Sequence, residues 1–538
     1  MKISNASATL ALLGLLAFTS GCKDFFDVNV DPLQPVSARL QDLLPGAQAG
    51  MATGLGFSLA GLGQPTSSLV NQLSSARGIG SYTLDGSSVE TQWRTLYTDC
   101  LANNEQIITQ GTASQDWGYV GIAQIQKAYV FSQMVDVWGD IPYSEALQGV
   151  GKPAPKFDKD SDIYKDLIQL INTGIQNLAK PSGTIPTNVD VMYKGDKAKW
   201  ARLGRSLKLK LFTQIRLNPT AVLSSQAALA DSVQRLLATP AQNLTDDFEF
   251  QYYAQNTPEN RHPGYQANYA ASPEDQIGRF FYVTVMNSRN DPRLPYFFYN
   301  QATPGQSVTA DFVLGRFVTT LLGSIGAAAS TSNSSTRTLP GLYAVGGKFD
   351  NGAGGVAIVT SGKGAVAQRL FTYSGSLFTE AEARLMVLND VAGARTAYEQ
   401  AIRANFAKVN AIATADGSPV IAATAINTYV NSALLRFDGT TRPASLPASA
   451  GLSATEAKLY NIIEEKYTAG FGFGLDAYTD YRRTGYPFIT LPGTTAEPNT
   501  RLIGGYPIRL PYRQGDLTSN PNAPAQPSLI NDKIFWDK

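Results

Sequence analysis

The chain has 538 residues, of which 44 are basic and 43 acidic, so its formal net charge is +1. Nucleic-acid-binding domains normally carry a basic excess, which this chain lacks, and a hydrophobic fraction of 43% excludes disorder throughout. The length allows a large core and two to four domains' worth of chain. With two cysteines and one histidine, the sequence cannot form a disulfide framework or a His-rich or Cys-rich zinc site.

The first 21 residues have the features of a secretory signal. Lys2 is followed by an apolar run at residues 10–18 and by Ser20-Gly21 directly before Cys22. This junction resembles the bacterial lipobox, so the sequence predicts that Cys22 is lipidated and becomes the mature amino terminus. The run is too short for a transmembrane anchor, which needs about 20 apolar residues. Cys100 then has no partner, and a buried apolar role is favoured over a reactive thiol.

Residues 22–45 are polar and interrupted by prolines, which indicates a tether between the lipid and a helical domain at 46–538. Helical periodicity begins at residues 91–110 and continues at 117–138, and these two segments are expected to form an antiparallel pair. A second pair is predicted at 163–178 and 197–217, with Ser161 or Asp162 as the N-cap of its first helix.

Residues 218–375 have a different character, because Pro, Gly and Tyr become frequent and helical periodicity fades. We interpret them as a loop-rich insertion that forms the ligand face, with short strands at 280–286 and 356–360.

Helical periodicity returns at 377–388 and, after a turn at Asn389-Asp390, at 394–406. The small residues of the second helix resemble a tetratricopeptide unit, although no strict 34-residue period runs through the chain. Degenerate repeats and ordinary helical hairpins both fit this pattern. One further helix is expected at 454–469. The predicted fold is therefore mainly α, with tetratricopeptide-like helix pairs, a loop-rich insertion and a few short strands.

Catalytic motifs are missing from the sequence. His262 is the single histidine, no Gly-x-Ser-x-Gly elbow occurs, and no phosphate-binding loop is complete. Residues 158–162 imitate the start of a calcium loop but lack its glycine and its final glutamate, so helix capping explains them better. We therefore expect no enzymatic activity, no catalytic residue, no metal and no cofactor.

Aromatic residues give the stronger functional indication. Tyrosines alternate with amides between residues 251 and 269, and flat rings stack on sugars while amides and arginine bind hydroxyl groups. Packing within a large loop is the competing explanation. The residues predicted to contact ligand are Tyr82, Tyr265, Asn268 and Tyr269.

Several segments, in order along nearly the whole mature chain, resemble the SusD/RagB family of outer-membrane lipoproteins, in particular its starch-binding-associated SusD-like branch. After Cys22, Lys23-Asp24 resembles the lysine-plus-acid signal of surface lipoproteins. The remaining segments are 25–32, the fairly specific Trp138-Gly139-Asp140-Ile141-Pro142-Tyr143, 291–297, 380–383, 398–402, 464–467, 481–487 and 509–512. We expect these motifs to be architectural, with Arg482-Arg483 holding carbonyls or acids near the carboxyl end.

The resemblance implies a nutrient-binding protein, with a glycan as the expected ligand, at the outer membrane. Its lipid anchor would hold it facing the cell exterior, with no other membrane contact and no nucleic-acid partner. The expected partner is a SusC-like TonB-dependent barrel, to which the lipoprotein delivers its ligand. A peptide-binding protein and a structural lid that binds no ligand are the alternatives.

Overall fold

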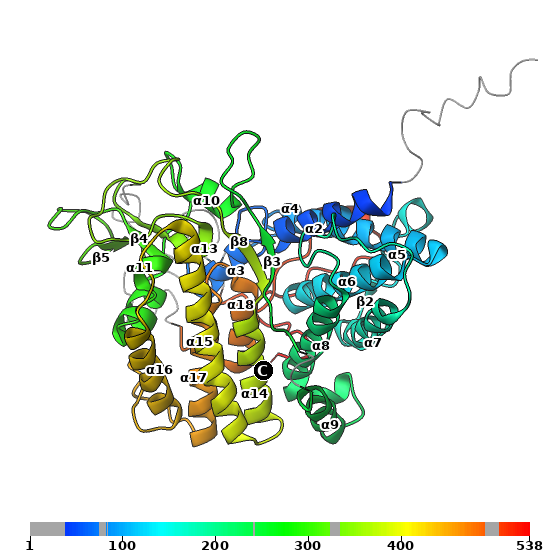
Figure 1. Cartoon of the computed structure of the whole chain (residues 1–538). Helices are drawn as coiled ribbons and strands as arrows, with labels where there is room; N and C mark the ends of the chain where they lie inside the picture. Colours follow the sequence, from blue (N-terminus) through cyan, green and yellow to red (C-terminus); the bar gives the residue numbers. More distant parts are fainter. Residues whose placement is uncertain are drawn as a thin grey trace, which may run out of the picture.

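The computed structural model describes residues 38–74, 82, 84–239, 243–322, 334–489 and 505–537. Helices form most of it, and consecutive long helices lie side by side (Figure 1). Helices α5 to α8 occupy one side of the molecule and α14 to α17 the other, while the loops around α10 and α13, with β4 and β5, gather above α15 and α16. The predicted mainly α architecture is confirmed.

The main helical segments of the amino-terminal half, within its described part, lie between residues 40 and 237. They are α2 (Leu40–Leu55), α3 (Gly63–Leu69), α4 (Glu90–Thr95), the π-helix η3 (Leu96–Leu101), α5 (Ala102–Ser114), α6 (Trp117–Trp138), α7 (Asp160–Ala179), α8 (Lys197–Gln214) and α9 (Gln226–Leu237).

Helices α6 and α7 approach closely because each offers a glycine at their contact. A Cβ atom on Gly121 would lie 2.6 Å from a Leu178 carbon, and one on Gly174 would lie 3.0 Å from Ile125. The predicted span of 117–138 agrees with α6, and 91–110 corresponds to the continuous run α4, η3 and α5.

The carboxyl-terminal half repeats the arrangement of paired helices. Its elements are α14 (Tyr373–Met386), α15 (Val391–Asp416), α16 (Ala423–Phe437), α17 (Ala454–Ala469), α18 (Gly474–Thr484) and α19 (Gln514–Ser519). The predicted turn at Asn389-Asp390 is confirmed, with Asp390 accepting a hydrogen bond from the Gly393 amide at the start of α15.

Short elements connect these halves. The strands form four two-stranded antiparallel sheets: β1 (Ile141–Pro142) with β2 (Phe157–Asp158), β3 (Phe248–Gln251) with β8 (Ala367–Phe371), β4 (Phe298–Asn300) with β7 (Thr338–Pro340), and β5 (Phe312–Leu314) with β6 (Phe317–Thr319). The short helices are η4 (Gly149–Gly151), η5 (Ile215–Leu217), η6 (Pro219–Ala221), α10 (Pro263–Asn268), η8 (Phe280–Met286), η9 (Asn287–Arg289), α11 (Leu294–Phe297) and α13 (Leu342–Val345).

The two strands predicted in the insertion are wrong. Residues 280–286 form the π-helix η8, and residues 356–360 belong to an irregular loop. The run Phe-Phe-Tyr-Val-Thr-Val-Met is short and apolar, and periodicity by itself does not separate a strand from a buried helix in such a run. Its buried residues, Phe280, Phe281, Val285 and Met286, lie on one side of a helix.

Other predicted boundaries need correction. The tether was expected to reach residue 45, but α2 begins at Leu40 and contains Pro45. Helix α7 begins at Asp160, so neither Ser161 nor Asp162 is its N-cap. Helix α9 lies inside the segment expected to be loop. Helix α15 extends ten residues beyond its predicted carboxyl end, and α16 follows it.

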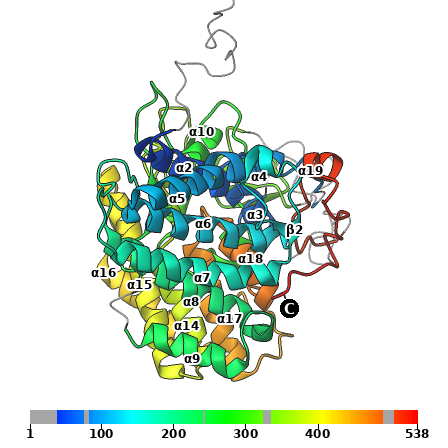
Figure 2. The same cartoon turned by 90° about the vertical axis from the view of Figure 1, so that its right-hand side faces the viewer.

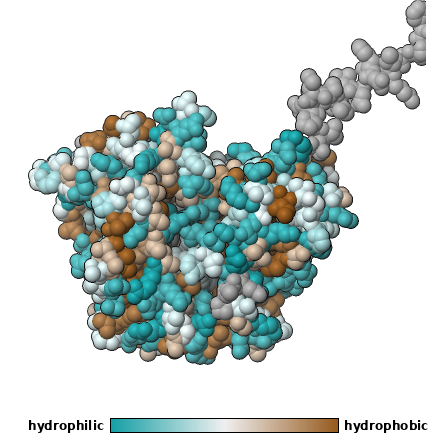
Figure 3. Space-filling view, in the orientation of Figure 1, coloured by the Kyte–Doolittle hydropathy of each residue, from teal (hydrophilic) through white to brown (hydrophobic). Residues whose placement is uncertain are grey.

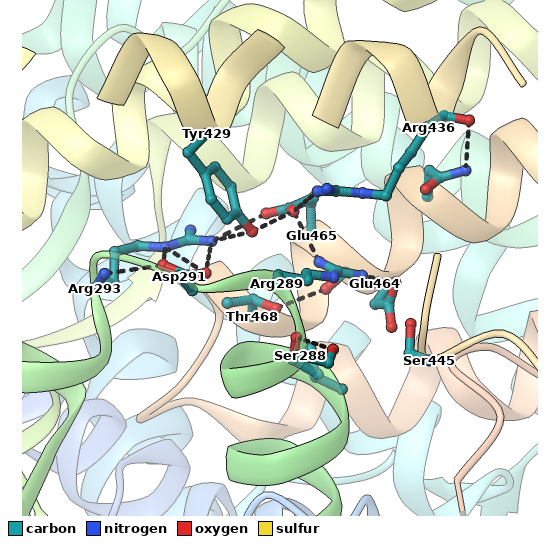
Figure 4. Close-up of polar contacts among 12 residues, drawn as sticks. Ser288, Arg289, Asp291, Arg293, Tyr429, Arg436, Ser445, Glu464, Glu465 and Thr468 are labelled. Atoms are coloured by element: carbon teal, nitrogen blue, oxygen red, sulfur yellow. Dashed lines mark hydrogen bonds and ion pairs between the residues drawn. The ribbon is translucent and has the colours of Figure 1, made fainter. Parts of the chain in front are cut away.

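A buried charge cluster joins the motif at 291–293 to the motif at 464–465 (Figure 4). The Arg293 guanidinium lies 2.6 Å from Asp291 and 3.1 Å from Glu465, and all three side chains are at most 1% exposed. Arg289 pairs with both Glu464 and Glu465. Burial opposes the charge on Glu465, but these arginines and Arg436 outweigh it and lower the pKa of Glu465 to about 2.

A second buried cluster joins α14 to α18 and to the residues that directly follow α8. Glu382 accepts from Arg216 at 2.8 Å and is bound by both terminal nitrogens of Arg483, which also contacts Asp480. Burial opposes ionisation of Glu382, yet Arg483 and Arg216 together lower its pKa to about 2. The motif residues Asp291, Arg293, Glu382, Glu464, Glu465 and Arg483 are therefore buried ion-pair partners that join separate segments of the chain, while the motif at 25–32 lies outside the described residues.

The chain after residue 505 returns to α6. Arg482 donates to the Ile508 and Asp136 carbonyls, as expected for the Arg482-Arg483 pair. Trp536 is fully buried, and its indole N–H donates to the Asp136 carboxylate at 3.1 Å. The carboxyl-terminal segment thus belongs to the core around α6.

Among the described residues, no helix is both long and apolar enough to cross a membrane. On the face shown in Figure 3, apolar residues are scattered among hydrophilic ones.

Candidate functional site

Two of the predicted ligand residues, Tyr265 and Tyr269, lie on or directly after α10. Their rings stack on each other, with centroids 4.7 Å apart and planes 11° from parallel. Tyr265 is 0% and Tyr269 1% exposed, so neither ring presents a face to solvent.

The hydroxyl groups of these tyrosines hold the loop at 346–364. The Tyr265 hydroxyl lies 3.0 Å from the Val359 carbonyl and 3.1 Å from the Gly362 carbonyl. The Tyr269 hydroxyl donates to the Pro340 carbonyl at 3.0 Å and accepts from the Lys348 amide at 2.8 Å. The pair therefore acts as a clamp behind the loop.

Asn268 and Tyr82 are also buried. The Asn268 amide donates to the Gly264 carbonyl and to Asp275, and its oxygen accepts from the Asp275 amide. Tyr82 is 3% exposed and lies edge-on to Tyr506, with centroids 5.4 Å apart.

The structure therefore brings Tyr265, Asn268 and Tyr269 together as a buried unit and places Tyr82 elsewhere in the interior. Direct stacking of a sugar on these four side chains needs exposed faces, which they do not have in this structure. The sequence pattern did not separate the aromatic residues that pack from those that face solvent.

An exposed loop leads from β3 to α10, and we call residues 252–261 the finger (Figure 1). Seven consecutive residues, 253–259, are exposed, and the Tyr253 side chain is 58% exposed. The Asn260 carbonyl accepts from the Tyr253 amide at 3.0 Å, and the Gln255 carbonyl accepts from the Asn260 amide at 2.9 Å. These bonds fix the backbone, so Tyr253 is presented by an ordered support.

The base of the finger is fastened to the loop that the tyrosines clamp. Arg261 pairs with Glu259 at 2.5 Å and donates to the Val359 carbonyl at 3.1 Å. Its guanidinium also lies over the Tyr265 ring, 5.3 Å from the centroid. Finger, clamp and loop form one connected structure.

A pocket of about 230 Å³, which we call the cup, is lined in part by Gln251, the residue directly before the finger. It lies between the carboxyl-terminal part of α15, the β3–β8 pair and α13, and small side chains leave its space open. The lining residues are Glu249, Gln251, Leu342, Gly346, Lys363, Ala365, Val366, Ala367, Lys408, Ala411, Ile412, Ala415 and Asp416. Sites that enclose whole small-molecule ligands measure about 300–1,000 Å³, so the cup suits one ring or one end of a longer ligand.

Charged groups converge on the cup. The Lys408 ammonium bridges Asp247 at 2.9 Å and Glu249 at 2.7 Å, and Lys363 donates to the Asp416 carbonyl at 2.7 Å. Burial raises the pKa of the Glu249 carboxyl; Lys408 opposes this rise and Asp247 adds to it. The cup thus combines an apolar wall with polar groups that can bind hydroxyls.

Sequence reasoning missed the cup residues on α15 because the helix was expected to end at residue 406. The available signal was the spacing of Lys408, Ala411, Ile412 and Ala415, which places one lysine and three small or apolar residues on one face of a longer helix.

His262 and Cys100, for which no catalytic or reactive role is expected, are both buried. His262 is buried and its pKa is lowered to about 3 by burial, so it is a neutral imidazole that accepts from the Gly264 amide. Cys100 is buried and burial raises the pKa of its thiol. Within the described part of the chain, no three His, Cys, Asp or Glu side chains are grouped so that they could hold a metal ion. Cys22 lies outside the described residues.

Comparison with known proteins decides the family. Residues 35–512 match the SusD-like family model, described as starch-binding and associating with the outer membrane. The chain belongs to the SusD-like family. A search of curated proteins found no match.

Solved structures share the fold of this SusD-like protein. A SusD/RagB family protein from Bacteroides thetaiotaomicron is 19% identical with a TM-score of 0.69, over 93% of this chain and 99% of the other. A chitin-binding protein is 19% identical with a TM-score of 0.67, over 93% and 100% of the two chains. A SusD homologue from Bacteroides fragilis is 21% identical with a TM-score of 0.66, over the same shares.

Proposed function

We propose that this SusD-like protein is a non-catalytic glycan receptor on the cell surface that delivers its ligand to a SusC-like TonB-dependent barrel. Membership of a family described as starch-binding and associated with the outer membrane supports this proposal. Lipidation at Cys22 would anchor the protein to the outer membrane, and the polar segment between Cys22 and α2 would allow it to face the exterior.

The ligand face of this proposal is the finger together with the cup. One observation carries it: the exposed Tyr253 ring stands on an ordered loop that begins directly after Gln251, and Gln251 lines a pocket with an apolar wall and charged polar groups. A sugar ring can stack on the tyrosine while the next ring enters the cup. Tyr265, Asn268 and Tyr269 then act through the loop and α10 rather than by contact.

Calorimetry on the unlipidated mature chain, carrying Cys22→Ala, tests this assignment against a panel of neutral oligosaccharides. We expect Tyr253→Ala to weaken binding about tenfold, since an aromatic contact contributes about 0.5–1.5 kcal/mol beyond its buried area. Ala415→Trp should abolish binding by filling the cup. Thr414→Trp, on the neighbouring exposed position of α15, and Leu435→Ala, on exposed α16, are the controls.

If Tyr253→Ala and Ala415→Trp both keep the wild-type affinity, the ligand does not bind at the finger and the cup. Binding of peptides with no response to any glycan would replace the sugar by a peptide. If neither glycans nor peptides bind while the barrel still co-purifies with the protein, the protein acts as a structural lid that binds no ligand.

The anchor is tested separately by mass spectrometry of the amino-terminal peptide. We expect an acylated Cys22, and Cys22→Ala should release the protein from the membrane fraction. Protease treatment of intact cells should remove the wild-type protein if it faces the exterior.

A further inference from the structure

A second and larger pocket is lined by residues of α4, η3, α5, the loop between β1 and β2, and the start of α19. Helices α4, α5 and α19 lie on the side of the molecule that Figure 2 turns toward the viewer. The volume of this pocket is about 620 Å³, within the range of about 300–1,000 Å³ in which small-ligand sites fall. We call it the groove. None of its lining residues belongs to the cup or the finger.

One wall of the groove is a row of polar side chains on α4, η3 and α5. Arg94, Thr98, Gln106 and Gln110 follow one another at intervals of four or eight residues. In an α-helix of about 3.6 residues per turn, such a row would gradually wind away from the groove. The wider π turn of η3 offsets this drift, and single π turns inside helices occur frequently at functional sites.

The opposite wall and the floor are apolar and fixed. The Tyr97 hydroxyl donates to the Pro142 carbonyl at 2.6 Å, which ties the loop after β1 to the helix. Trp93 forms the floor, held by Trp138 and Tyr512 with ring centroids 4.9 and 6.4 Å away. Leu147 and the prolines 142, 153 and 155 complete the apolar side.

The polar wall has hydrogen-bonding capacity that the protein does not use. Gln106, Thr109 and Gln110 line the groove, and their side chains make no hydrogen bond within the described part of the chain. Their amide and hydroxyl groups can both donate and accept, as the recognition of sugar hydroxyls requires.

The unused charge in the groove is positive. Glu105 is paired with Lys127 at 2.5 Å, and Lys152 with Glu145 at 3.2 Å. Arg513 is paired with Glu90 at 2.5 Å and lies 3.8 Å from Asp516, so both lining carboxylates already have a cation.

Arg94 is exposed and has no side-chain partner among the residues that the structure describes. A guanidinium of this kind binds a carboxylate through two parallel hydrogen bonds.

We propose that the groove is a second binding site, which takes an acidic oligosaccharide. A uronic-acid carboxylate pairs with Arg94, ring hydroxyls bind Gln106, Thr109 and Gln110, and the apolar ring faces lie against Leu147 and the prolines. The site would operate independently of the finger and the cup.

Calorimetry of the mature chain carrying Cys22→Ala, with tetragalacturonate and its methyl ester as probes, tests this site. We expect the free acid to bind about tenfold more tightly than the ester, and Arg94→Gln to remove that difference, because a charge-assisted hydrogen bond is worth more than a neutral one. Raising the salt concentration should weaken the binding of tetragalacturonate and leave the binding of its methyl ester unchanged. Arg235→Gln, an exposed arginine on α9, is the matched control.

Ala102→Trp fills the groove at a lining position and should abolish binding of both probes, while thermal unfolding confirms that each variant is folded. Absence of tetragalacturonate binding at low salt, or equal affinity in Arg94→Gln and wild type, would overturn the proposal. Loss of binding in Ala415→Trp instead of Ala102→Trp would place the acid in the cup and overturn it as well. Binding of tetraglutamate with no response to tetragalacturonate would replace the glycan by a peptide.

Discussion

Two buried aspartates make the stability of the molecule depend on pH in an unusual direction. Burial raises the pKa of Asp136 to about 6 and that of Asp275 to about 6, from an ordinary value of 3.8. The folded chain therefore binds more protons than the unfolded chain between about pH 4 and pH 6. In this window, protonation of the two carboxyl groups stabilises the folded chain as the pH falls. Above pH 6 both groups are charged in the folded chain, so the full desolvation penalty lowers its stability.

The prediction for Asp136 concerns the free energy of unfolding in urea at pH 7 and pH 5. Asp136→Asn has no carboxyl to protonate, so the share of the pH dependence that Asp136 supplies, about 1.4 kcal/mol per unit of pKa shift, should disappear. If the variant has the same difference between the two pH values as the wild type, the protonation argument is wrong. Glu382 and Glu465, whose pKa values are lowered from 4.5 to about 2, act in the opposite direction below about pH 5, where the unfolded chain begins to bind protons at these groups, and they contribute little between pH 5 and pH 7.

Glu382 should be far more sensitive to substitution than a surface glutamate. Glu382→Gln leaves Arg216 buried without a counter-charge and leaves Arg483 with Asp480 alone, and breaking a buried pair in this way costs about 3–5 kcal/mol. Glu399→Gln, which breaks a partly exposed pair with Arg403 on α15, should cost about 0–1 kcal/mol. Urea unfolding of both variants at pH 7 provides the comparison, and equal losses would contradict the role assigned to the buried cluster.

At the scale of elements, the clamp formed by Tyr265 and Tyr269 controls a loop rather than a ligand contact. Tyr265→Phe keeps the ring stack but removes the hydroxyl that holds the Val359 and Gly362 carbonyls, at a cost of about 1 kcal/mol. We expect faster hydrogen exchange confined to residues 346–364 and weaker binding in the cup.

Tyr478→Phe is the matched control, since its hydroxyl holds the Pro507 carbonyl elsewhere. Protection of residues 346–364 that stays at the wild-type level in Tyr265→Phe would show that other contacts order the loop.

At the scale of the whole molecule, the tail is part of the core. Trp536→Ala removes a fully buried side chain, which typically costs about 3–5 kcal/mol, although it lies close to the carboxyl end of the chain. Ile530→Ala, six residues earlier and 42% exposed, should leave the thermal unfolding temperature nearly unchanged. Similar shifts for the two variants would mean that the tail is only loosely attached.

Much of the architecture could be predicted because local sequence patterns determine where the helices form. Helices α6 and α17 agree with their predicted spans, since their apolar periodicity and flanking residues such as Gly139 and Ser453 mark both ends. The helix η8 was mistaken for a strand, because seven apolar residues carry no distinguishing period. Helix α15 runs past its predicted end, where Lys408 pairs with Glu249 of β3 and the Asp416 carbonyl accepts from Lys363, and such contacts between distant segments leave no local signal in the sequence.

The candidate site was less predictable, because burial is a property of the assembled chain. Tyr253 and Tyr265 look alike in the sequence, yet one is exposed on the finger and the other packs against Gly364. The cup depends on β3, α13 and α15, three elements widely separated in sequence. No local pattern could place Glu249 beside Lys408.

The position of Trp536 also has a consequence for how the protein matures. Because its indole donates to Asp136 at the carboxyl-terminal end of α6, this contact joins two parts of the chain that are 400 residues apart. It therefore cannot form before residue 536 has been synthesised.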